Sequence, residues 1–186
     1  MNLRVVFDLS DDDLRHFQLI MREARQASAA ARPEDIVAAA QGLLDEAATR
    51  RIPEFIRTRF DALKTMIDML SDHEWRLPEE DAARVLNALA YFAEPEDLIP
   101  DHIPGLGFLD DAIMIELVVR ELKYELEAYK DFCAFRAGSR SGLKARTTDI
   151  TRDDWLAARR ADLQEKMHRR RKGRDSKTVK PRLKLF

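Results

Sequence analysis

The feature that most constrains the fold is a segment in the middle of the chain where three prolines interrupt a helical pattern. Pro95, Pro100 and Pro104 are followed closely by Gly105 and Gly107. Proline lacks a backbone N–H and biases the preceding residue toward extended conformations, so one continuous helix is excluded. The apolar residues of this segment are too many for a solvated loop: Leu98, Ile99, Ile103, Leu106, Phe108 and Leu109. We therefore expect a folded-in elbow between two antiparallel helices.

Helical periodicity dominates the rest of the chain. One apolar stripe, widened by Phe55, Met66 and Met69, repeats at intervals of four and three residues: Ile56, Phe60, Leu63, Ile67 and Leu70. Ser10 before three aspartates, and prolines at 33, 53 and 78, mark helix starts. The predicted helices cover about 11–31, 33–49, 53–71, 78–94, 110–136 and 151 onward. The expected fold is an all-α bundle of about five to six helices, with a short extended segment before the first.

The charge of the chain divides it into an acidic body and a basic end. Residues 159–186 hold 12 Lys and Arg against 3 Asp and Glu, whereas the first 158 residues hold 20 against 31. Gly138 and Gly142 enclose a serine- and arginine-containing stretch that resembles a flexible break. We therefore predict a helical domain at 1–137, a linker at 138–150, and a basic helix and tail at 151–186, disordered from Gly173. Trp155, Leu156, Leu163 and Met167 give that helix a weak apolar stripe.

The basic end is a candidate contact surface for RNA or a ribonucleoprotein. No aromatic residue is interleaved with its charges, so it would hold a phosphate backbone without stacking on bases. Anionic lipid, the acidic body of the same chain, and solvent alone are the alternatives. The apolar residues 183–186 at the end would dock on a protein partner or a second copy. The candidate nucleic-acid residues are Arg169, Arg170, Arg171, Lys172, Arg174, Lys177, Lys180, Arg182 and Lys184.

Several classes of protein are disfavoured by what the sequence lacks. Cys133 is the one cysteine, which excludes an internal disulfide framework and a multi-cysteine zinc site. No uncharged apolar run reaches the ~18 residues that a membrane helix needs. The first residues do not have the pattern of a secretory signal. We therefore expect no transmembrane segment and a cytoplasmic location.

The elbow resembles the YkvA-like family of domains of unknown function, whose core pattern is Pro-x-Asp-x-Ile-Pro-Asp-x-Ile-Pro-x-x-Gly-x-x-Asp-Asp. The resemblance covers residues 86–119, and His102 stands where an apolar residue is expected. It implies a helical domain, found beside membrane segments in some longer proteins, and it implies no reaction. The matching positions are Pro95, Asp97, Ile99, Pro100, Asp101, Ile103, Pro104, Gly107, Asp110 and Asp111.

The polar residues of the elbow support two interpretations. Oxygen and nitrogen donors in this number can hold a divalent metal, which is the one cofactor left open, at Asp97, Asp101, His102, Asp110 and Asp111. Alternatively Asp110 or Asp111 caps the long helix and the others brace the turns, which we favour. No nucleophile beside a base and no phosphate-binding glycine loop is apparent.

These observations leave three hypotheses for function. The first is a non-enzymatic interaction protein whose basic arm contacts RNA or a ribonucleoprotein. The second is a metal-binding module or metal-dependent enzyme at the aspartates. The third is a peripheral membrane-associated protein, disfavoured because the last helix has few large apolar residues to insert.

Overall fold

The computed structural model describes residues 10–93, 108–142 and 152–178, and all regular secondary structure in these ranges is helical. This confirms the all-α expectation. The predicted extended segment at the N-terminus and the elbow at 94–107 lie outside the described residues. The elements are α1 (Asp11–Ala27), η1 (Ser28–Ala30), α2 (Pro33–Thr49), α3 (Glu54–Ser71), α4 (Glu79–Leu89), η2 (Ala90–Ala93), α5 (Leu109–Glu121), α6 (Lys123–Gly142) and α7 (Arg152–Thr178).

Helix starts follow local chemistry. Ser10 and Asp13 form a capping box, in which the Ser10 hydroxyl accepts from the backbone N–H of Asp13 at 3.2 Å. Pro33 occupies the first turn of α2, as predicted, whereas Pro53 and Pro78 occupy the N-cap positions of α3 and α4. Proline suits both places, because the first backbone N–H groups of a helix have no partner within it.

The longest predicted helix is two helices. A turn at Leu122 separates α5 from α6, with φ −94° and ψ 21°, although the N–H of Leu122 still donates to Val118 at 2.9 Å. Leu122 is fully buried. The turn lets α5 pack on α3 while α6 runs along α7. The continuous apolar pattern could not reveal it, because both helices bury residues next to the turn.

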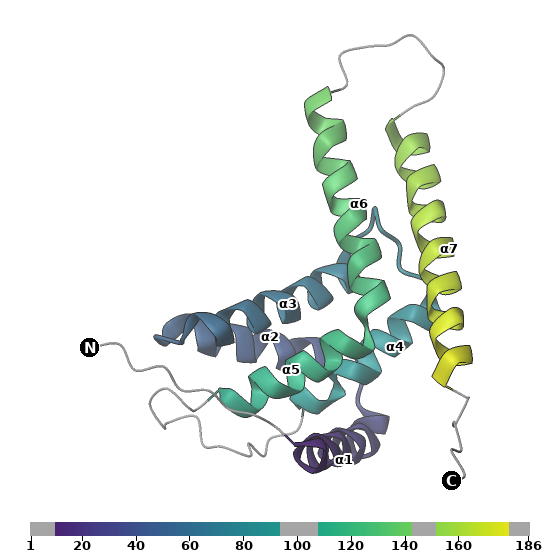
Figure 1. Cartoon of the computed structure of the whole chain (residues 1–186). Helices are drawn as coiled ribbons and strands as arrows, with labels where there is room; N and C mark the ends of the chain where they lie inside the picture. The colour runs from purple at the N-terminus through teal and green to yellow at the C-terminus, as the bar shows by residue number, and fades with distance from the viewer. Residues whose placement is uncertain (1–9, 94–107, 143–151, 179–186) are drawn as a thin grey trace.

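The helices are arranged around one hydrophobic core with a projecting pair at its edge. Figure 1 shows α6 and α7 side by side as an upright antiparallel pair, with α2, α3 and α5 extending away from its lower part. The predicted α3 stripe lies in the core, but Phe55 is 48% exposed and does not widen it. Leu156, Leu163 and Met167 of α7 are buried in the same core, whereas Trp155 is 52% exposed and leaves the stripe predicted for this helix.

The α3–α4 connection lies between α6 and α7, as Figure 1 shows. Trp75 in this turn is fully buried, with ring centroids 5.8 Å from Tyr129 and 5.1 Å from Phe132. The burial of Trp75 could not be predicted from the sequence, because this residue stands alone in a polar stretch, outside any periodic stripe. The turn therefore joins the projecting pair to the rest of the core.

Two predictions about the second half of the chain need correction. Residues 138–142 are helical and close α6, because its hydrogen-bond ladder continues through Gly138 rather than ending there. Residues 173–178 are the last part of α7 rather than a disordered tail. The division into 1–137 and 151–186 remains a prediction. Among the described helices, none combines the length and the apolarity needed to cross a membrane.

Candidate functional site

The two aspartates at the start of α5 are buried inside the protein. Asp110 and Asp111 are 1% and 6% exposed. The prediction that one of them caps the helix is wrong, because α5 begins at Leu109 with Phe108 at its N-cap and no side-chain cap. Both carboxylates lie instead in the first helical turn, where the positive end of the helix dipole favours negative charge.

The remaining elbow residues cannot be placed beside these aspartates. The metal candidates Asp97, Asp101 and His102 lie outside the described residues, as do the structural motif residues Pro95, Ile99, Pro100, Ile103, Pro104 and Gly107. Within the described ranges, no group of three His, Cys, Asp or Glu side chains is arranged to hold a metal ion. The metal hypothesis therefore stays a prediction.

The basic helix α7 uses its inner face to bind the acidic body. The Arg171 guanidinium donates to Asp81 Oδ1 at 2.6 Å and to Glu125 Oε1 at 3.0 Å. Both carboxylates have fully buried side chains, and that of Arg171 is 14% exposed. Burial alone lowers the pKa of the Arg171 guanidinium, but the hydrogen bonds to Asp81 and Glu125 raise it above its ordinary value. Arg171 thus neutralises two buried acids, and little of its side chain remains exposed for contact with a nucleic acid.

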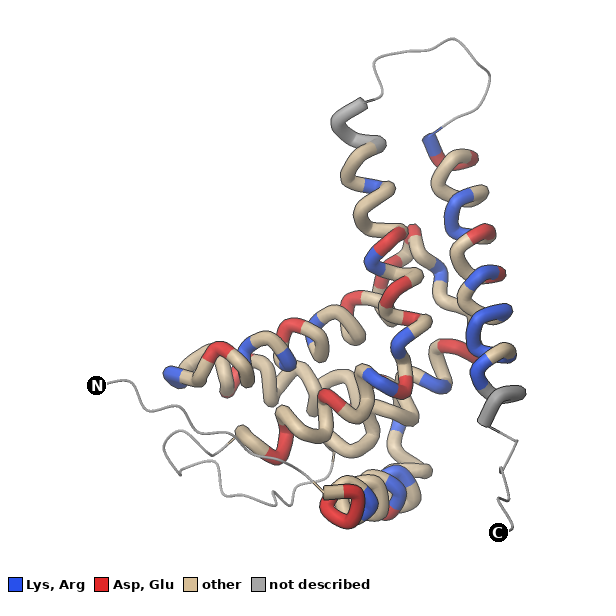
Figure 2. The backbone as a smooth tube through the Cα atoms, in the orientation of Figure 1, with Lys and Arg blue, Asp and Glu red and all other residues tan. Residues whose placement is uncertain are grey.

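Two further side chains complete this arrangement, which we call the Arg171 cluster: Asp81, Glu125, Arg171, His168 and Arg84. His168 Nε2 lies 2.6 Å from Asp81 Oδ2, and Arg84 Nε donates to Glu125 at 3.3 Å. His168 therefore contacts a buried carboxylate, while its own side chain remains 37% exposed. In Figure 2 the blue residues in the lower half of α7 lie next to red residues of α4. The cluster joins α4, α6 and α7 through charges that each helix alone would leave unpaired.

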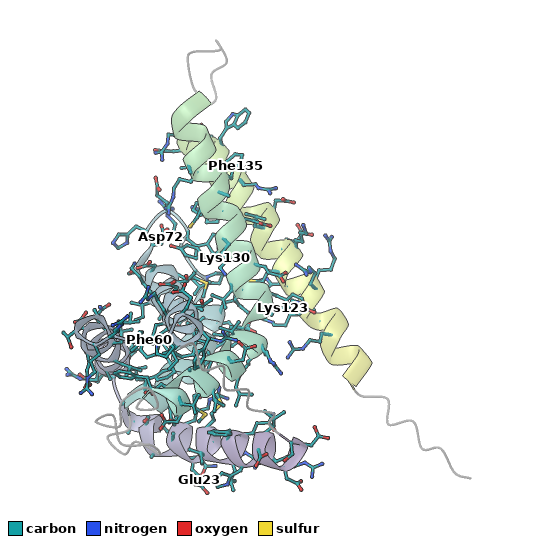
Figure 3. All side chains as sticks on the ribbon, turned by 60° about the vertical axis from the view of Figure 1, so that its left-hand side comes forward. Glu23, Phe60, Asp72, Lys123, Lys130 and Phe135 are labelled. Atoms are coloured by element: carbon teal, nitrogen blue, oxygen red, sulfur yellow. The ribbon has the colours of Figure 1, made fainter. Side chains whose placement is uncertain are left out.

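A second polar cluster holds the α3–α4 turn against α6. Asp72 accepts from the Tyr129 hydroxyl at 3.0 Å and from Arg136 Nη1 at 2.8 Å, and it lies beside the middle of α6 in Figure 3. Burial raises the pKa of the Asp72 carboxyl, but hydrogen bonds from Trp75, Tyr129 and Arg136 lower it more, below the ordinary value. Glu74 also pairs with Arg136 at 2.9 Å, so the cluster extends to the protein surface. These contacts fix the turn against α6.

Two other predicted nucleic-acid residues also contact α6 and its neighbours. Arg170 pairs with Glu127 at 2.7 Å, and its guanidinium lies 4.7 Å from the centre of the Tyr124 ring. Arg174 donates to the backbone carbonyl of Arg120 at 3.2 Å. Both side chains are exposed to solvent, so they lie at the protein surface and not in the core.

The outer face of α7 carries basic side chains of a different kind. Lys166, Arg169 and Lys172 are exposed and form no ion pair or hydrogen bond through their side chains within the described part of the chain. They recur every third residue, so they follow one another along the exposed part of the helix, with Lys166 at its edge. We call these three residues the cationic stripe. The candidates Lys177, Lys180, Arg182 and Lys184 have no described side chain.

The segment from α4 to α5 is similar in sequence to a known protein family. The model of the family described as "Protein of unknown function (DUF1232)" matches residues 82–117. The "Uncharacterized membrane protein YkvA" of Bacillus subtilis (strain 168) is 36% identical over 74 residues, which cover 37% of this chain and 68% of that protein. No solved structure is significantly similar. Helix α7 lies outside the matched segment. The chain therefore belongs to the YkvA-like DUF1232 family of proteins of unknown function.

Proposed function

We propose that this protein is a non-enzymatic interaction protein that binds RNA or a ribonucleoprotein through the cationic stripe of α7. The observation that carries the proposal is the separation of the basic residues into two sets. Arg171 is engaged with buried carboxylates, whereas Lys166, Arg169 and Lys172 have no carboxylate partner among the described residues. Three exposed cations in one line, about 4.5 Å apart along the helix axis, suit the closely spaced charges of a phosphate backbone.

The proposal concerns phosphate contacts and no sequence preference. No tryptophan, tyrosine or phenylalanine lies between the three cations. Bases therefore have no ring on which to stack at this surface. Contacts of this kind are electrostatic, so binding falls steeply as salt rises.

Membrane association is the second candidate, and two observations favour it. The relative from Bacillus subtilis is named a membrane protein. Trp155 is exposed, as are the aromatic residues that sit at lipid interfaces. Against it, Leu163 and Met167 are each 1% exposed, so α7 has no free apolar face to insert beside its cations. Trp155 also lies more than ten residues before the cationic stripe, near the opposite end of the helix.

A binding measurement with substituted proteins tests the proposal. The variant K166Q/R169Q/K172Q removes the cationic stripe and keeps good helix formers. The control R22Q/R51Q/K130Q removes the same charge from exposed residues elsewhere. Binding to a fluorescent single-stranded RNA of mixed sequence is followed by anisotropy at low salt. We expect the stripe variant to bind at least tenfold more weakly than the wild type, and the control to stay within about twofold.

The same proteins are tested for co-sedimentation with vesicles of phosphatidylglycerol and phosphatidylcholine. RNA binding lost in the stripe variant and kept in the control supports the proposal. Equal loss in both variants, or no RNA binding by the wild type, contradicts it. Vesicle binding by the wild type without RNA binding replaces it with the membrane candidate.

A further inference from the structure

Along the outer face of α7, acidic side chains come first and basic side chains follow. Asp162 and Glu165 precede Lys166, Arg169 and Lys172, and all five side chains are exposed. With 3.6 residues per turn, Asp162, Glu165, Arg169 and Lys172 lie on the side of the helix away from buried Leu163 and Met167, and Lys166 lies at the edge of that side. One half of the face therefore carries the acids, of which Asp162 also pairs with Arg159 at 2.9 Å, and the other half is basic. Among the described residues, no helix covers this face, and α7 stands at the edge of the fold in Figure 1.

Such a face is complementary to itself when it is turned end for end. In a parallel pair of identical helices, acidic residues would meet acidic residues and the arrangement would be repulsive. In an antiparallel pair, the acidic half of each helix meets the basic half of the other, as a two-fold axis requires. We propose that two copies of this chain associate through the outer faces of their α7 helices, antiparallel, about an axis that passes beside Glu165 and Lys166.

The positions along α7 agree with this register. When Glu165 of one copy faces Lys166 of the second, Asp162 faces Arg169 of the second copy, and both contacts occur twice by symmetry. Ala158 then faces Gly173 of the second copy, and both residues are exposed. Small residues at these places let the two helix backbones approach closely without displacing larger side chains.

Trp155 adds apolar surface at each end of the same contact. It is 52% exposed and lies, with Phe135 and Ala158, along an open hollow of about 330 Å³ where α6 and α7 meet. In the antiparallel pair, this region covers the end of the second copy's α7. Exposed ion pairs are individually weak and are screened by salt, so we expect association that is reversible and salt-sensitive.

Association of this kind has a consequence for the cationic stripe. Lys166 and Arg169 would face carboxylates of the second copy and would not be open to phosphate. Self-association and RNA binding then exclude one another, so RNA should release single copies from the pair. This competition rests on the proposed function, whereas the self-association does not.

Variants with reversed charges on the outer face of α7 test the inference. The variant D162K/E165K has a basic outer face, and K166E/R169E has an acidic one apart from Lys172. The control E23K/K130E reverses exposed charges on α1 and α6, at positions labelled in Figure 3. Molar mass is measured by sedimentation velocity at low salt over a range of protein concentrations. We expect the wild type and the control to rise from 21.5 kDa toward twice that mass. Each charge variant alone should stay at the mass of one copy.

An equal mixture of the two charge variants is the deciding sample. A basic face and an acidic face should pair, so the mixture should regain the mass of two copies, which also shows that both variants are folded. The inference is overturned if the wild type stays at the mass of one copy, if either variant associates alone, or if the mixture fails to associate. Because D162K/E165K keeps the cationic stripe, its RNA binding reports on the proposed function separately. Loss of RNA binding in the wild type would remove that function and leave the mass measurements unaffected.

Discussion

Neighbouring residues of α7 differ in what they contact because of the direction in which they point. Arg171 turns inward and donates to the fully buried carboxylates of Asp81 and Glu125. Lys172, the next residue, is exposed. Successive side chains on a helix point about 100° apart, so a run of four basic residues necessarily covers several directions. The charge run at 169–172 thus combines structural cations with free ones.

The first prediction concerns Arg171. Arg171→Met keeps the length of the side chain but leaves Asp81 and Glu125 buried near one another without their shared cation. We expect a loss of about 3 kcal/mol in the free energy of unfolding, measured by urea denaturation at pH 7. Lys172→Met, the matched change on the outer face, should alter it by no more than about 0.5 kcal/mol. Equal effects of the two substitutions would show that the Arg171 cluster does not hold α7 in place.

At the scale of elements, α7 depends on three apolar residues spaced along one side. Leu156, Leu163 and Met167 are 4%, 1% and 1% exposed, and they lie in the same core as the other helices. The many charged residues of α7 conceal this attachment when the sequence is considered alone. An element that appears from composition to be an appendage is packed along its length against α6.

The second prediction is a test of that attachment. Leu163→Ala should lower the free energy of unfolding by about 3 kcal/mol in a single transition, because a buried methyl-bearing side chain is removed from a shared core. Leu163→Met conserves volume and should cost less than about 1.5 kcal/mol. Helical signal is followed by circular dichroism during urea denaturation. Two separate transitions in the wild type would instead support independent units at 1–137 and 151–186.

Several helix starts and most of the α3 stripe could be predicted from the sequence because their causes are local. Ser10 with Asp13, and the spacing of Ile56, Phe60 and Leu63, act within one or two helical turns. The turn at Leu122 could not be predicted, because the apolar pattern continues through it while the packing partner changes.

For the candidate site, the sequence indicated that α7 is basic but not which cations are free. That choice depends on Asp81 and Glu125, which lie about 90 and 46 residues away in sequence from Arg171 and meet it only in the folded chain. The same holds for His168, whose partner Asp81 is 87 residues distant. The acidic body is one of the alternatives that the sequence offers as a partner of the basic end, and for these residues it is the observed partner.

At the scale of the whole molecule, the segment that matches the family and the basic helix are different parts of one structure. Residues 82–117 run from α4 into α5, and α7 packs beyond them on α6. The family segment holds the buried Asp110 and Asp111, whereas the exposed cations are on α7. We therefore propose that RNA contacts α7, while the family segment contributes part of the core that supports this helix.

The salt dependence of RNA affinity tests this account most directly. The affinity of the wild type and of K166Q/R169Q/K172Q for the same RNA is measured at several salt concentrations, and log affinity is plotted against log salt. Three phosphate contacts contribute about 2 to 3 to the steepness of the slope, so the variant should be shallower by that amount. Parallel lines for the two proteins would mean that the cationic stripe touches no phosphate, and the central claim would be wrong.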